Sequence, residues 1–182
     1  DDIFKKISSD KLPKRNNESL KNITFSDLSF FKYFHEPPKE KTNVNILNNN
    51  KYEVKIINGT CKNFEDKNIE IRNINESDFL TFSEKYNENQ DDIIIDFNKI
   101  FLNSGFFFNI KSNNKIEIKL IHETDENNTI FQNNFFIFNK NCNVLLEEEY
   151  SFSHNTTNNI HYNIQVHEGA SIKHNIFQDF SN

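Results

Sequence analysis

The sequence has 182 residues, of which 35% are hydrophobic and 20 are Phe, and its formal net charge is −6. This length suits one domain or one compact part of a larger protein. The acidic balance argues against general nucleic-acid binding, which needs a basic face, and the apolar runs are far shorter than the roughly 20 residues that cross a bilayer.

Two cysteines, Cys61 and Cys142, are too few for a disulfide framework and lack the spacing of a zinc site. No charged segment followed by an apolar one opens the sequence, as a secretory signal would. We therefore expect a cytoplasmic protein without a nucleic-acid or membrane partner. Because the sequence begins at Asp1 and contains no methionine, we also expect it to be part of a longer chain.

The first 105 residues predict a helical and mixed α/β region. Ser26 and Asp27 can cap a short helix, and prolines at 37 and 38 end it. Alternating apolar residues between Val44 and Ile57 predict short strands, with Asn-rich turns on either side of the second one.

Two further helices are expected in this region, over residues 76–86 and 91–102. In the second, several Ile and Phe side chains share one face, acids occupy the first turn and Gly105 can end the helix. We therefore place a boundary after residue 105 and expect residues 106–182 to form a different, all-β part.

From residue 106 onward the apolar residues alternate, and a longer repeat of 28 residues underlies the alternation. The segments that correspond are FNIKSNNKIEIKL (108–120), FIFNKNCNVLLEE (136–148) and IQVHEGASIKHNI (164–176). Each reads as a strand, a tight turn and a second strand, which cannot bury its apolar face alone but can do so when stacked. The repeat predicts the start of a parallel β-helix, with the polar segments 122–132 and 151–159 as connections.

The alignment of the repeats fixes which positions should be neighbours. Ile116, Val144 and Ile172 correspond and should form one inward column. The turn positions that should tolerate positive φ are Asn113, Asn141 and Gly169.

Three consecutive glutamates, Glu147 to Glu149, and the nearby His154 are the most conspicuous candidates for a metal or acid/base site. Alternation turns Glu147 and Glu149 outward and puts Glu148, aligned with Leu120 and Ile176, near the end of the inward row. Three adjacent glutamates cannot then face one metal ion, and we expect a solvated strand end.

The alternation and the repeat also give predictions for His161, His174 and Cys142. His161 lies on the polar face of its strand and should be a surface residue, whereas Tyr162 lies on the other face. His174 takes the inward position held by Ile118 in the first repeat, so it should be at least half-buried and hydrogen-bonded. A structural histidine is favoured over a ligand because no second His or Cys lies at metal-binding spacing. Cys142 reads as a small turn residue.

Motifs for nucleophilic catalysis or phosphate binding are missing from the sequence, which has only three glycines. We therefore predict no catalytic, cofactor-binding or metal-binding residue and a protein that is not an enzyme.

Several segments together resemble one known family. They are LPKRNNESLKNITFSDL (12–28), FNKIFLNSGFFFNI (97–110), NNFFIFNKNCNVLLEEEY (133–150) and NIHYNIQVHEGASIKHNIFQ (159–178). In the same order they are similar to the N-terminal part of SufD members of the SufB/SufD family of iron–sulfur cluster assembly proteins. Pro13 with the basic residues after it, and His174 with Gln178, match family motifs. Leu20 stands where Trp is usual, and Ser104 precedes Gly105 where Asp is usual.

The resemblance implies a right-handed parallel β-helix preceded by a helical and mixed N-terminal region. It also implies a non-enzymatic scaffold subunit of the SUF machinery that acts with SufB and the ATPase SufC, mainly through regions downstream of this sequence. The chain alone would bind no cofactor, and an iron–sulfur cluster would belong to the full complex.

Two alternatives remain open at the level of sequence. A carbohydrate-binding or carbohydrate-active β-solenoid would use a long concave face, and a lytic site on it would need acids aligned across several repeats. A small metal-dependent β-barrel would need clustered histidines, whereas the six in this chain are scattered.

Overall fold

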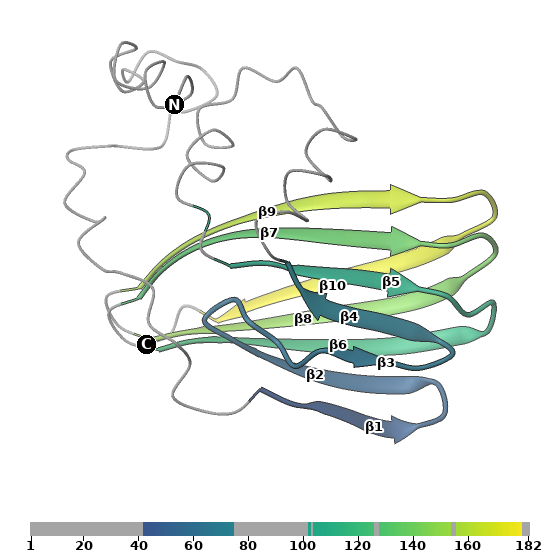
Figure 1. The fold of residues 1–182 in the computed structure, drawn as a ribbon, viewed down its shortest axis with the longest axis horizontal. Helices are drawn as coiled ribbons and strands as arrows, with labels where there is room; N and C mark the ends of the chain where they lie inside the picture. Colours follow the sequence, from purple (N-terminus) through teal and green to yellow (C-terminus); the bar gives the residue numbers. More distant parts are fainter. Residues whose placement is uncertain (1–41, 75–101, 103, 126–127, 154–155, 180–182) are drawn as a thin grey trace, which may run out of the picture.

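The computed structural model describes residues 42–74, 102, 104–125, 128–153 and 156–179 (Figure 1). This part of the chain contains ten β-strands and no helix, so it is mostly β, as predicted. The strands are β1 (Val44–Asn48), β2 (Lys51–Ile57), β3 (Phe64–Glu65), β4 (Ile69–Asn73), β5 (Phe106–Ile110), β6 (Lys115–Thr124), β7 (Thr129–Phe138), β8 (Asn143–Phe152), β9 (Thr157–Val166) and β10 (Ser171–Asp179).

The strands expected between Val44 and Ile57 are present as β1 and β2, and the turn after β2 carries Asn58 and Gly59 at positive φ. The expected helices near Ser26, at 76–86 and at 91–102 lie outside the described residues, apart from residue 102. No helix in the described ranges is long and apolar enough to cross a membrane.

The strands form two five-stranded sheets. The first sheet has the order β1-β2-β6-β8-β10, and the second has the order β3-β4-β5-β7-β9. Pairing is parallel from β2 through β6 and β8 to β10, and from β5 through β7 to β9. It is antiparallel at the other end of each sheet, where β1 meets β2 and where β3, β4 and β5 meet. Residues of both sheets share one apolar core, and Figure 1 shows the sheets running alongside each other.

The 28-residue repeat of the sequence is also the offset between paired strands: each residue of β6 pairs with the residue 28 positions later in β8, and β8 pairs with β10 in the same way. Ile116 pairs with Val144, and Val144 pairs with Ile172. The first two side chains are buried, and Ile172 packs partly buried against the same core. The predicted inward column is therefore confirmed. We call β5 and β6 the first layer, β7 and β8 the second layer, and β9 and β10 the third layer.

The turn inside each layer differs from the prediction in one respect. Asn141 and Gly169 have φ angles of 60° and 73°, as their alignment requires, but Asn113 is not among the residues with positive φ. The second and third turns are also joined, because the amide of Asn141 donates to the carbonyl of Glu168. The first turn uses a side chain instead: the amide of Asn114 donates to the Ser112 hydroxyl.

The polar segments predicted as connections are mostly strand. β6 continues to Thr124 and β7 begins at Thr129, so the prediction that 122–132 and 151–159 lie outside the strands is wrong. Polar side chains extend these strands because they find partners between the layers. The Thr124 hydroxyl, for example, donates to the Asn158 side chain at 3.1 Å.

Phenylalanine supplies most of the large buried side chains of the second sheet. Phe106, Phe108, Phe136 and Phe138 are at most 2% exposed, and their ring centroids lie 5.6–6.2 Å apart where they pack. Aromatic rings at these separations contribute beyond the area that they bury. This stack holds the first two layers together.

Strands from both sides of residue 105 share the same sheets, since β2 pairs with β6 and β4 pairs with β5.

Gly105 lies at the entry to β5 with φ of 156°, and a Cβ atom there would come within 2.3 Å of the Asn133 carbonyl oxygen. Only glycine permits this close approach of two backbones.

Candidate functional site

Glu148 lies on β8 and points into the space between the sheets. It pairs with Leu120 on β6 and Ile176 on β10, as the alignment predicted, and its side chain is fully buried. The expectation of a solvated strand end is therefore wrong for this residue. β8 continues for four residues beyond it, so alternation keeps position 148 inside the core and not at its rim.

The neighbouring glutamates behave as alternation predicts. Glu149 is exposed and pairs with Lys119 at 2.9 Å, and Glu147 is half-buried. His154 lies outside the described residues. The three glutamates therefore do not form one site.

Four side chains of the described residues donate hydrogen bonds to the Glu148 carboxylate. His174 on β10 reaches Oε1 through Nε2 at 2.6 Å. His122 on β6 reaches Oε2 through Nε2 at 2.9 Å, and the hydroxyls of Tyr150 on β8 and Tyr162 on β9 reach the same oxygen at 2.7 Å each. The two phenol oxygens also contact each other. We call these five residues the Glu148 cluster.

Burial by itself would raise the pKa of Glu148, because a charge is poorly solvated inside a protein. The hydrogen bonds from His122 and His174, the charge of His122 and the Tyr162 hydroxyl outweigh burial and hold the pKa well below the ordinary value. Burial and the nearby Glu148 charge raise the pKa of both tyrosines. Glu148 is therefore ionised, and the phenols remain protonated donors.

Ring packing fixes the orientation of the donors. The His122 ring stacks on Tyr150, with centroids 4.2 Å apart and planes 12° from parallel. The Tyr162 ring packs against Phe136 of the core at 5.7 Å and meets His174 edge-on at 6.3 Å. The donors are thus held by the aromatic core and do not depend on the carboxylate alone for their position.

The geometry of the cluster restricts its chemistry. Three donors meet at Oε2 and one reaches Oε1, and the side chain is fully buried, so Glu148 is poorly placed to act as a base or nucleophile. His122 and His174 approach opposite oxygens, which puts the carboxylate between them. Within the described residues, no group of three or more His, Cys, Asp or Glu side chains is arranged to hold a metal ion. The arrangement is suited to holding strands together.

The structure settles the other predicted residues. His174 is half-buried, with its side chain 23% exposed, and it is hydrogen-bonded as predicted. His161 is half-buried, so the prediction of a surface residue is wrong. Both cysteines are buried free thiols, Cys142 lies in the predicted turn, and burial raises the pKa of Cys61 to about 12.

Sequence reasoning missed His122 and Tyr150. Both fall in or beside segments that were taken as polar connections. The signal that could have found them is the repeat itself, because continuing its register by two residues beyond Glu148 aligns His122, Tyr150 and Gln178 on the inward side.

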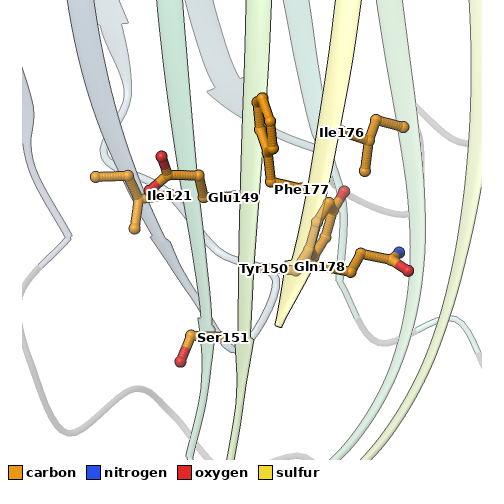
Figure 2. A pocket seen from close by; sticks show the side chains of 7 residues that line it. All are labelled: Ile121, Glu149, Tyr150, Ser151, Ile176, Phe177 and Gln178. Carbon is orange, nitrogen blue, oxygen red and sulfur yellow. The ribbon is translucent and has the colours of Figure 1, made fainter. Parts of the chain in front are cut away.

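A pocket of about 570 Å³ adjoins the cluster at the edge of the first sheet (Figure 2). Its lining residues combine apolar and polar side chains: Ile121, Glu149, Tyr150, Ser151, Ile176, Phe177 and Gln178. Tyr150 belongs to both the pocket and the cluster. Comparison of the chain with models of protein families, with curated proteins and with solved structures finds no match.

Proposed function

We propose that the two sheets are the first layers of a right-handed parallel β-helix. We further propose that the chain is a non-enzymatic scaffold subunit of the SUF machinery, acting in the cytoplasm with SufB and SufC. The proposal rests on the order of the SufD-like segments along the sequence. The observation that carries it beyond the sequence is the parallel pairing of strands one 28-residue repeat apart, in both sheets.

The described core supports a structural role over a catalytic one. The inward side chains of the first two layers are mainly apolar, and the buried carboxylate among them accepts hydrogen bonds from four side chains. The proposal includes no cofactor for this chain alone, and it assigns the iron–sulfur cluster to the assembled complex.

A carbohydrate-active β-solenoid gains less support. Such a site needs acids aligned from layer to layer, but Glu148 is flanked by Leu120 and Ile176. On the outer face Glu149 is flanked by Ile121 and Phe177. Neither face carries a row of acids at these positions.

The test is co-expression of the tagged chain, extended to the full gene, with SufB and SufC proteins of the same source. We expect both partners to be recovered on the tag, and an unrelated ATPase of the same class not to be. The Glu149→Gln variant, which changes an exposed residue, should recover them equally. The Phe136→Ala variant, which empties part of the core, should not.

Failure to recover either partner with the folded full-length protein would overturn the proposed partnership. A second arm tests the chain alone: after anaerobic reconstitution with iron and sulfide, we expect no stoichiometric cluster, because clustered cysteine ligands are missing from its sequence. Stoichiometric iron and sulfide on the isolated chain would contradict a scaffold that needs its partners.

A further inference from the structure

The third layer is attached to the molecule differently from the first two. In those layers the inward residues of the second sheet, such as Phe108 and Phe136, are about 1% exposed. The residue that continues this column in the third layer, Ile164, is 50% exposed. Val166 and Ile176 are 52% and 49% exposed. The third layer therefore gains much less from apolar burial, since that gain scales with the area removed from water.

Besides Ile172, which packs partly buried against the core, two inward side chains of the third layer are amphipathic or polar and converge on one group. Tyr162 on β9 donates to Glu148 at 2.7 Å, and His174 on β10 donates to it at 2.6 Å. Each strand of the layer thus has its own charge-assisted hydrogen bond to the second layer. Such bonds are shorter and about twice as strong as neutral ones.

We propose that Glu148 is a latch that fastens the third layer, so that β9 and β10 open together as a unit when the carboxylate loses its charge or its donors. Opening would uncover the edges of β7 and β8 and the inward face of the second layer. The rest of the core, from β2 to β8, keeps its apolar packing and stays closed.

The groups that face the carboxylate decide how the latch responds to acid. They are His122 from β6, Tyr150 from β8, Tyr162 from β9 and His174 from β10, and β2 contributes apolar Val54 to the same ladder. Glu148 is the one carboxylate among them. Protonation of Glu148 converts four charge-assisted bonds into neutral ones or breaks them, which weakens the attachment of both strands of the third layer.

Hydrogen–deuterium exchange of the folded chain, read by mass spectrometry for each strand, tests the latch. In Glu148→Gln we expect amides of β9 and β10 to exchange at least about tenfold faster, which corresponds to roughly 1.4 kcal/mol of opening free energy. Amides of β2, β6 and β7 should keep a larger opening free energy than those of β9 and β10 in both the wild type and the variant, because opening of the third layer does not expose them.

Two single-bond variants test whether the strands open together. Tyr162→Phe keeps the ring and removes one donor from β9, and His174→Gln removes one from β10, so each variant should accelerate exchange in both strands. The matched controls are Glu149→Gln, which changes the neighbouring exposed carboxylate, and Tyr52→Phe, which removes a phenol that bonds Asp66 and Asn68 elsewhere in the core. Neither control should change the exchange of β9 or β10.

Three results would overturn the latch. Unchanged exchange of β9 and β10 in Glu148→Gln would show that other contacts hold the layer. Equal opening free energies for β9, β10 and the core strands would show that the third layer does not open on its own and would make Glu148 an ordinary core residue. Acceleration of β9 and β10 in Tyr52→Phe as large as in Tyr162→Phe would show that the layer responds to any loss of stability.

Discussion

The second and third layers have the same strand lengths to within one residue, the same turn and the same alternation, yet they are held in different ways. β7 and β8 lie between two other layers, and inward residues such as Phe138 and Leu146 are almost completely buried. β9 and β10 lie at the edges of the described sheets, and Ile164, Val166 and Ile176 on these strands are about half-exposed. In the third layer, the hydrogen bonds of the Glu148 cluster compensate for this smaller apolar burial.

The difference shows that the apolar pattern of a sequence determines which way a side chain points but not how much of its area is buried. Ile164 and Phe136 are aligned and point the same way, but only Phe136 has a layer on each side. A buried charge with four donors can hold strands where apolar burial is small, although it is costly if a partner is lost.

The largest expected difference is between core residues of the two layers. Phe136→Ala should lower the free energy of unfolding by about 3–5 kcal/mol, because it leaves a cavity among three aromatic neighbours in the first and second layers. Ile176→Ala should cost less than about 1 kcal/mol, since half of that side chain is already in water. Urea unfolding followed by circular dichroism measures both, and equal losses would remove the contrast.

The next effect concerns the adjacent glutamates. Glu148→Gln should cost about 3 kcal/mol, because it removes a buried charge and leaves His122, His174 and the phenols with weaker or missing acceptors. Glu149→Gln should cost at most about 0.5 kcal/mol, since its pair with Lys119 is solvent-exposed. Comparable losses in the same unfolding experiment would mean that burial of Glu148 does not matter for stability.

Lowering the pH should reduce the difference in unfolding free energy between the wild type and Glu148→Gln. The folded chain holds the pKa of Glu148 below its ordinary value of 4.5, so the unfolded chain takes up a proton first as the pH falls. The stabilisation is therefore present above about pH 4.5 and declines below it. Unfolding free energies measured at descending pH should show the wild type approaching Glu148→Gln, by about 1–2 kcal/mol between pH 6 and pH 3. A constant gap would contradict an ionised Glu148.

The smallest effect compares equivalent turns. Asn141 has φ of 60°, so Asn141→Ala should cost about 1 kcal/mol from backbone strain. Asn113 occupies the matching position without positive φ, and Asn113→Ala should change stability by less than about 0.5 kcal/mol. Thermal unfolding of the two variants side by side checks this, and equal melting temperatures would mean that the turns do not differ as described.

The sequence predicted the ladder but not the site. Ile116, Val144 and Ile172 revealed the register because alternating apolar residues are visible in the sequence. His122 and Tyr150 stayed hidden because they stand beside polar runs that resemble loop sequence, and only a partner in the next layer makes them inward strand residues. The alignment of Glu148 was correct, but the expectation that it is solvated was wrong. Its burial depends on where β8 ends and on hydrogen-bond donors from three other strands, which the repeat alone does not reveal.

The most direct test of the third layer's attachment is a double-mutant cycle between Glu148 and His174, read as unfolding free energy at neutral pH. If the 2.6 Å contact fastens β10 to β8, Glu148→Gln and His174→Gln should couple by about 1–2 kcal/mol, so that the double variant loses less than the sum of the single losses. Losses that add to within about 0.3 kcal/mol would contradict the account, because they would show that the two side chains stabilise the chain independently.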